Sequence, residues 1–460
     1  MCTLAARLVK LREVTVTLFT VPSFYDNVQA EIARDFFPGE ELLASRLRAE
    51  VSFKIAWGKL LDRQPLVCAK TGAEFEPHSV LPSAAILDKS GTKAYIWFPA
   101  AVVGVGRFFK GLNTSGGGND GAVETIEEVD APVPPSQASI LTSMKGKLVR
   151  DPFNPPMYDY EYNPQEFPYP PGFIDNVMAR IPEILDKTEG IVTFDAADYA
   201  PHVANQLRAY YEKTGRKVYY AGPLIPQRQE DTSKDPRSQE VTKFLDEKLA
   251  SHSEGSLIYI SFGSLFWPVD NAKLWAVLDV IMERNIPFVM SCVAAWFSKP
   301  PVEMQEKIAC YSHGIMADWV PQQTLLAHPM SSQATGWYIS HGGHNSTLET
   351  ILAGIPTILW PISGDQPANA VYLSETLDVS FELIEVRHGA GAGKIYRNGR
   401  VPVGTVDAVK AEMRDILERA YGEEGARKRA NILSLGKTLQ TAWSENGIAR
   451  GEVEALLDAI

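Results

Sequence analysis

The chain has 460 residues, a formal net charge of −12, 45% hydrophobic residues and 22% charged residues. This length exceeds the size at which one hydrophobic core usually stops growing, so two domains are expected. The acidic balance argues against nucleic acid or an anionic membrane surface as the main partner. The four cysteines are scattered and lie near no histidine at metal-site spacing, so we expect a cytoplasmic protein without a metal knuckle.

Two further absences in the sequence shape this expectation. Lys10, Arg12 and Glu13 interrupt the apolar residues of the N-terminus, which is not the pattern of a signal peptide. No run of about 18 apolar residues occurs, so no membrane span is predicted.

Strand and helix patterns alternate along the first half of the chain, which predicts an α/β architecture with parallel sheets. Helices are expected at 4–11 and 171–185, and strands at 14–19, 84–87, 95–98, 190–194 and 218–222. A polar stretch over 227–238 has the composition of a linker. Strands follow at 257–262, 288–291, 337–340 and 357–360, and the chain closes with helices at 406–421 and 452–460.

A strand, a glycine-rich turn, a helix and a second strand are expected in succession between residues 336 and 361. The two glycines of the turn, 341–344, allow a ligand to approach the backbone closely. Residues 345–346, Asn and Ser, are types that cap helices, so we expect the helix itself over 347–353. Gly354 is the residue type that commonly follows a helix C-terminus.

The N-terminus of this helix suits a diphosphate, because it offers free N–H groups and a partial positive charge. Glu349 lies one turn after Asn345 on the same face, where its carboxylate can accept both hydroxyls of a ribose. Asp365 and Gln366 follow the next strand and are expected in the same crevice as His341, because ligands of open α/β sheets bind beyond the carboxyl ends of the strands. An Asp-Gln pair suits sugar hydroxyls.

These segments together resemble the signature of family 1 UDP-glycosyltransferases, and the chain is most similar to fungal members. Four extra residues stand around 331–335 relative to the plant spacing. The resemblance implies a fold of two Rossmann-like domains facing a cleft, the GT-B type. The matching residues are Trp319 to Gln322, Leu326 to His328, Ser340 to Ser346, Glu349, Gly354, Trp360, Pro361, Asp365, Gln366, Asn369 and Ala370.

The resemblance also implies a role for each donor-site residue. Trp319 stacks on uracil and the Val320 backbone bonds the base edge, while Gln322 and Glu349 bind the ribose. Asp365 and Gln366 hold the sugar hydroxyls. The diphosphate is held by Ser264, His341, Asn345, Ser346 and the backbone at Gly343 and His344.

By the same resemblance, residues 1–230 form the acceptor-side domain and 231–237 a linker. Residues 238–432 form the UDP-sugar-binding domain, and the helices of 433–460 pack back on the first domain. The acceptor-side domain is expected to be incomplete and its sheet to lack its first strand, so that the chain is N-terminally truncated relative to the family. The segment 151–173, crowded with Pro and Tyr, either lines an acceptor pocket or is an irregular surface connector.

The expected function is the transfer of a hexose, glucose, from a UDP-sugar to a hydroxyl of a small lipophilic acceptor, with inversion. The UDP-sugar is a co-substrate, and the resemblance implies no cofactor, no metal and a monomer. The family uses a His after its first strand as the base, steadied by an Asp, but the first histidine here is His78. Asp88 is the best match for the steadying Asp, and an ordinary turn residue is an equal reading of it.

Two alternatives follow from this expectation. One is a UDP-sugar-binding pseudoenzyme or an inactive truncated gene product that lacks the catalytic His loop. The other is a UDP-sugar epimerase of the same architecture, which Trp319 together with Asp365 and Gln366 disfavours.

Overall fold

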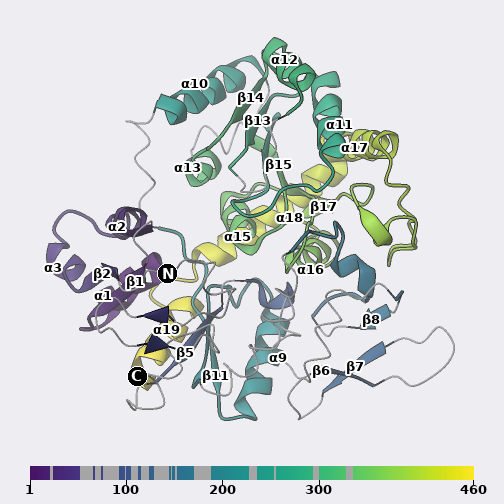
Figure 1. Cartoon of the computed structure of the whole chain (residues 1–460). Coiled ribbons are helices and arrows are strands. Elements are labelled where there is room, and N and C mark those ends of the chain that lie inside the picture. The colour runs from purple at the N-terminus through teal and green to yellow at the C-terminus, as the bar shows by residue number, and fades with distance from the viewer. Residues whose placement is uncertain are drawn as a thin grey trace. The chain divides into compact units, whose positions relative to one another are not determined.

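In the computed structural model the chain forms two compact units (Figure 1). Unit 1 comprises Met1–Pro99, Asp175–Glu230 and Thr441–Ile460, and unit 2 comprises Ala100–Ile174 and Asp231–Gln440. The structure describes residues 1–20, 24–51, 66–67, 74–75, 93–98, 100–104, 112–115, 124–128, 145–146, 148–150, 153–169, 188–226, 236–252, 255–293, 300–327 and 335–460.

Unit 1 is an α/β assembly with short parallel sheets. One sheet has the order β11-β10-β5 and the second pairs β1 with β2, both parallel, while β3 and β4 form an antiparallel pair. The strands are β1 (Val16–Thr20), β2 (Leu47–Val51), β3 (Leu66–Val67), β4 (Glu74–Phe75), β5 (Tyr95–Phe98), β10 (Gly190–Thr193) and β11 (Lys217–Tyr220).

The helices of unit 1 bury apolar side chains against these sheets. The helix α1 directs Leu4 into a cluster with Val192 and Tyr219, and the C-terminal helix α19 adds Val453 and Leu456 to the same cluster. Burial of each such side chain contributes about 1.5–3 kcal/mol. The helices are α1 (Cys2–Leu11), α2 (Tyr25–Ala33), α3 (Glu41–Ala44), α9 (Pro201–Glu212) and α19 (Ile448–Ala459).

A six-stranded parallel sheet forms the centre of unit 2. Its order is β14-β13-β12-β15-β16-β17, so the chain starts in the middle, winds to one edge, and then winds to the other. This is the doubly wound arrangement, whose strand order reverses between β12 and β15. The strands are β12 (Leu257–Ser261), β13 (Phe288–Ser291), β14 (Gly314–Ala317), β15 (Thr335–Ser340), β16 (Thr357–Leu359) and β17 (Ser380–Glu382).

Helices cover both faces of this sheet, so its central strands are predominantly apolar and are buried along their whole length. The helices α11 and α17 run side by side on one face and enclose a core that includes Trp275, Trp337 and Trp360 (Figure 1). The helical elements are α10 (Pro236–Ser251), α11 (Asn271–Glu283), α12 (Val302–Cys310), α13 (Gln322–Ala327), α15 (His344–Ala353), α16 (Gln366–Val371), a π-helical turn η5 (Tyr372–Thr376), a 3-10 turn η6 (Gly389–Gly391), α17 (Val406–Ala420) and α18 (Glu423–Gln440).

A smaller sheet of order β6-β7-β8-β9 also belongs to unit 2. After it the chain continues through a 3-10 turn, η3 (Asp159–Tyr162), toward residue 169. The strands are β6 (Leu112–Ser115), β7 (Glu124–Glu128), β8 (Leu148–Arg150) and β9 (Met157–Tyr158).

The α/β class with parallel sheets, predicted from the sequence, is confirmed. The strands expected at 95–98 and 288–291 have those bounds, and the other expected strands that lie in the described residues differ by one or two residues at an end. The strand expected at 84–87 and the helix expected at 171–185 lie outside the described residues. No helix in the described part of the chain is both long and apolar enough to cross a membrane.

Candidate functional site

Two loops meet where the strand order of the large sheet reverses. One follows β12 and holds Gly263 and Ser264, and the other follows β15 and begins with His341. Gly263 has a φ of +71°, and a Cβ at this position would lie 2.9 Å from Cε1 of His341. Glycine therefore lets the two loops approach, and exposed Ser264 stands beside them. In a doubly wound sheet this is where ligands bind.

The helix α15 begins at this reversal point, three residues earlier than expected. Gly343 is its N-cap residue, with an extended backbone (φ −64°, ψ 143°), and its carbonyl oxygen accepts from the N–H of Thr347 at 3.0 Å. The prediction that residues 345–346 cap the helix was wrong, because the helical hydrogen bonds already begin at the Gly343 carbonyl oxygen. Gly343 has no side chain that could cap the first turn, so the helix N-terminus presents N–H groups to an anion.

His341 lies beside this helix N-terminus and is 7% exposed. Burial lowers the pKa of its imidazole to about 4, so the ring is neutral at pH 7. Its Nδ1 has no hydrogen-bond partner among the described residues. The ring of Phe266 lies 6.1 Å from the imidazole, centroid to centroid, and contributes to its apolar surroundings. A neutral imidazole can donate one hydrogen bond to a phosphate oxygen.

Gln322, Ser346 and Glu349 form one hydrogen-bonded group. The Gln322 Nε2 donates to Ser346 Oγ at 3.1 Å and to Glu349 Oε2 at 2.6 Å. The second carboxylate oxygen, Glu349 Oε1, accepts from Gln323 Nε2 at 2.9 Å. The structure thus brings together three residues that the sequence placed on two separate segments, and it orients a carboxylate beside the first turn of α15.

Two buried tyrosines, which the sequence did not point to, hold the Gln322 amide. The hydroxyls of Tyr259 and Tyr338 each donate to Gln322 Oε1 at 3.2 Å. The two rings are register partners on the adjacent parallel strands β12 and β15, with centroids 4.7 Å apart. Because both the oxygen and the nitrogen of the Gln322 amide are hydrogen-bonded, its direct function in this state is to position Glu349. The two tyrosines become neighbours only because β12 lies next to β15 in the sheet, and the sequence does not show which strands are adjacent.

Trp319 and Val320 point to opposite environments. Val320 is 4% exposed and packs in a cluster with Leu325 and Leu326 of α13, whereas Trp319 is 36% exposed. An aromatic side chain that leaves so much of its surface open next to an anchored residue suits stacking on a planar ligand.

Asp365 and Gln366 follow β16 and are held by different partners. The Gln366 Oε1 accepts from the backbone N–H groups of Ile362 at 2.9 Å and Ser363 at 3.0 Å, which leaves its Nε2 to donate to a ligand. Asp365 Oδ2 accepts from Asn369 Nδ2 at 2.8 Å. Burial raises the pKa of the Asp365 carboxyl, and the Asn369 hydrogen bond opposes this rise.

Asn369 links this loop to the glycine turn. The same Nδ2 that donates to Asp365 also donates to the carbonyl oxygen of Gly342 at 2.9 Å. Gly104 lies against Asp365, since an added Cβ would come 2.6 Å from the Asp365 Cβ. Buried His344 acts electrostatically on Asp365. The sequence matched Asn369 to a motif without assigning it this connection.

Two predicted site residues remain, Asn345 and Asp88. Asn345 is exposed in the first turn of α15, open to solvent as a phosphate contact requires. Asp88, the candidate for catalysis, lies outside the described residues.

The fold is of the doubly wound α/β class, and the candidate site combines a helix N-terminus suited to an anion with hydrogen-bond acceptors on both sides of it. Residues 218–381 match the family model of UDP-glucoronosyl and UDP-glucosyl transferases. The chain is 31% identical over 334 residues to the UDP-glycosyltransferase eriJ of Hericium erinaceus, covering 70% of this chain and 64% of that protein. It is 25% identical over 297 residues to nuatigenin 3-beta-glucosyltransferase of Solanum aculeatissimum, covering 62% and 56%.

The chain thus matches between half and two thirds of the length of these relatives. Among solved structures it is similar to Phytolacca americana UGT2 complexed with UDP-2fluoro-glucose and pterostilbene, with a TM-score of 0.67 and 18% identity, covering 100% of this chain and 95% of that one. A Siraitia grosvenorii transferase in complex with UDP gives a TM-score of 0.68 at 15% identity, with the same coverage. The chain belongs to the family 1 UDP-glycosyltransferases and has their GT-B type of fold.

Proposed function

We propose that this protein transfers a hexose, glucose, from a UDP-sugar to a hydroxyl group of a small lipophilic acceptor, with inversion at the anomeric carbon. The observation that carries the proposal is the group formed by Gln322, Ser346 and Glu349 at the N-terminus of α15. A carboxylate that can accept from ribose hydroxyls lies there beside N–H groups that can donate to a diphosphate, which supports a UDP-sugar as the ligand. This group lies inside the matched region 218–381.

The proposed donor contacts follow from the chemistry of each group. Trp319 and the Val320 backbone take the uracil, and Glu349, positioned by Gln322, takes the ribose hydroxyls. The diphosphate lies at Ser264, His341, Asn345, Ser346 and the backbone of Gly343 and His344. Asp365 and Gln366 take the hexose hydroxyls.

The same groups promote departure of UDP. When the bond between the anomeric carbon and the phosphate oxygen breaks, negative charge develops on the leaving diphosphate. The N–H groups of α15 and the neutral His341 imidazole stabilise this charge, and they are already oriented before the reaction. Asp365 and Gln366 orient the hexose for attack by the acceptor hydroxyl.

We assign the acceptor side to the first domain, residues 1–230, with Asp88 as the catalytic carboxylate. We propose that residues 238–432 contain the donor site and that 433–460 pack on the first domain. We also propose a cytoplasmic monomer that needs no cofactor or metal, because the four cysteines are scattered and the sequence places no carboxylate pair for a metal.

The experiment is a transfer assay with the full chain, UDP-glucose, and a panel of phenols and small lipophilic alcohols. Mass spectrometry detects the glycoside, a coupled assay measures UDP release, and NMR of the anomeric proton reports inversion. A glycoside formed by the parent chain and lost in Glu349→Ala supports the proposal. Donor binding without any glycoside points to a UDP-sugar-binding protein, and absence of donor binding contradicts both.

A further inference from the structure

A short segment that precedes the large sheet reaches both ends of the proposed donor-sugar position. The ring of Phe167 lies 5.2 Å from that of Phe266 in a T-shaped contact, and Phe266 in turn lies beside His341. Two residues further on, the Tyr169 hydroxyl donates to Ser363 Oγ at 3.0 Å. A tight turn joins the two contacts, in which the Tyr169 N–H donates to the Phe167 carbonyl oxygen at 2.8 Å.

Tyr169 also lies close to the groups proposed to hold the hexose. Burial raises the pKa of its phenol and the Asp365 carboxylate raises it further, while the hydrogen bond to Ser363 opposes the rise. The Ser363 N–H donates to Gln366 Oε1 at 3.0 Å, so Tyr169, Ser363 and Gln366 are linked in sequence. In this network the Tyr169 phenol donates to Ser363 Oγ, so the Ser363 hydroxyl proton is directed away from the phenol and can act as a donor.

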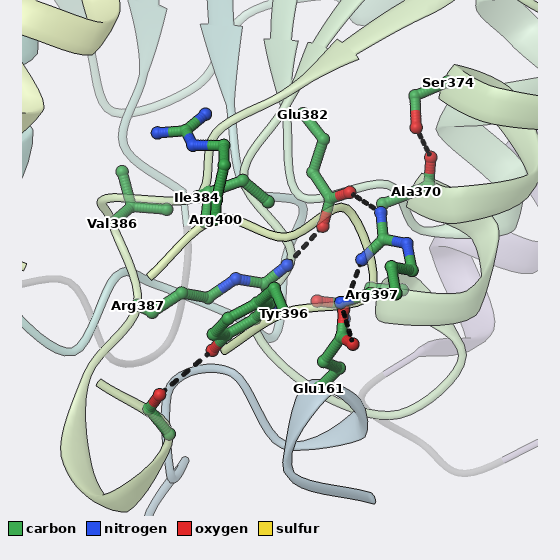
Figure 2. A network of polar contacts seen from close by, with 12 residues as sticks. Glu161, Ala370, Ser374, Glu382, Ile384, Val386, Arg387, Tyr396, Arg397 and Arg400 are labelled. Carbon is green, nitrogen blue, oxygen red and sulfur yellow. Dashed lines mark hydrogen bonds and ion pairs between the residues drawn. The ribbon is translucent and has the colours of Figure 1, made fainter. Parts of the chain in front are cut away.

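The segment is fixed to unit 2 by its preceding residues. Figure 2 shows the Arg397 guanidinium between the carboxylates of Glu161 and Glu382, and both ion pairs are buried. The Arg397 N–H also donates to Glu161 Oε1 at 2.9 Å. Nearer the turn, Gln165 Nε2 donates to the Val386 carbonyl oxygen at 2.9 Å. A segment with this many fixed points is suited to hold a side chain in one position.

A hexose attached to a diphosphate at α15 must extend from His341 toward Asp365 and Gln366. The turn from Phe167 to Tyr169 contacts the surroundings of both. We propose that this turn forms a wall of the hexose subsite and that the Tyr169 phenol, paired with Ser363, is a specificity-determining group for the sugar of the donor. This inference rests on the proposed function, since it needs a UDP-sugar in the site.

The test compares the affinities of UDP and UDP-glucose by calorimetry for the parent chain and for Tyr169→Phe. Removing the phenol oxygen should leave the affinity for UDP within about twofold of the parent value. It should lower the affinity for UDP-glucose by about 3- to 10-fold, the range for one hydrogen bond. Ser363→Ala should give the same selective loss, and the double variant should lose little more. Tyr421→Phe is the matched control, because its hydroxyl donates to the Ser256 carbonyl oxygen away from the site.

A selective loss in Tyr169→Phe, absent in Tyr421→Phe, supports the inference. Equal weakening of UDP and UDP-glucose would assign Tyr169 a purely structural function, and unchanged affinities would remove it from the subsite; either result overturns the inference. UDP-xylose, which lacks the C6 hydroxymethyl group, adds a second measurement. The ratio of the UDP-glucose affinity to the UDP-xylose affinity should change in Tyr169→Phe, whereas a purely structural function of Tyr169 would leave this ratio constant. If the parent chain binds no UDP, the proposed function fails first and this inference with it.

Discussion

Trp319 offers a sharp test of the nucleotide site, because the effect of its truncation on binding can be measured separately from its effect on folding. It is 36% exposed, so replacing it with Ala also removes buried surface, and the loss of folding free energy should be smaller than for a fully buried Trp. A fully buried Trp would cost about 3–5 kcal/mol of folding free energy on the same change. Loss of stacking on a base costs about 1–3 kcal/mol, which corresponds to a Kd increase of about 5- to 150-fold. Val320, which is 4% exposed, keeps the backbone in place.

Calorimetric titration with UDP measures this effect for the parent chain, Trp319→Ala and Trp319→Phe. We expect Trp319→Phe to retain most of the affinity, because an aromatic face remains. Tyr421→Ala is the control, since Tyr421 is also an exposed aromatic residue, 46% exposed, in the same unit. Unchanged UDP affinity in Trp319→Ala, measured at a temperature where a melting curve shows the variant to be folded, would refute the assignment of Trp319 to the base.

Three further predictions concern the sugar pair, the buried histidine and the ion network. Asp365→Ala should lower the affinity for UDP-glucose by about 10-fold or more and leave the affinity for UDP constant. Calorimetry would contradict this if the affinity for UDP fell equally. In competition, the parent chain should bind UDP-glucose more tightly than UDP-galactose. For His341, burial lowers the folded-state pKa to about 4 against an ordinary value of 6.5, so the unfolded chain binds the proton first as pH falls through 6.5. The unfolding free energy of the ligand-free chain should therefore drop by up to about 3 kcal/mol between pH 7 and 4, and denaturation of His341→Asn should lack this part of the slope. Arg397→Ala leaves the carboxylates of Glu161 and Glu382 buried without that partner, and should cost about 3–5 kcal/mol in urea unfolding; a loss below about 1 kcal/mol would contradict it.

The strands that the sequence predicted well are those with strong apolar character. Four of the six strands of the large sheet were expected, because β12, β13, β15 and β16 are buried on both faces. The strands at the two edges, β14 and β17, were missed. β14 is only half-buried and begins with Gly314, and β17 is framed by polar Ser380 and Glu382, so each gives a weak strand signal.

The helix α18 was missed for a different reason. It spans 18 residues, yet its buried positions include Gly425, Lys428 and Gly436, which do not form an apolar pattern. An added Cβ at Gly436 would collide with the Ile351 carbonyl oxygen of α15, so glycine there permits close packing of the two helices. A stripe of small residues gives little periodic signal in a sequence.

For the candidate site, spacing along the chain suggested the residues but not the contacts between them. The geometry around Glu349 depends on Tyr259 and Tyr338, which become neighbours only when β12 pairs with β15 in one register. The connection of Tyr169 to Ser363 joins residues 194 positions apart. Such contacts depend on the tertiary fold, which local patterns do not specify.

The most direct test of the proposed donor site is calorimetric titration of the full chain with UDP, for the parent, Glu349→Ala and the control Glu283→Ala. Glu349 accepts two amide hydrogen bonds at the proposed ribose position, whereas Glu283 forms an exposed ion pair with Arg414 elsewhere in unit 2. We expect saturable binding by the parent and the control, and affinity at least about 10-fold lower for Glu349→Ala, the range for hydrogen bonds to a charged group. No binding by the parent, or equal affinity in all three proteins, would contradict it.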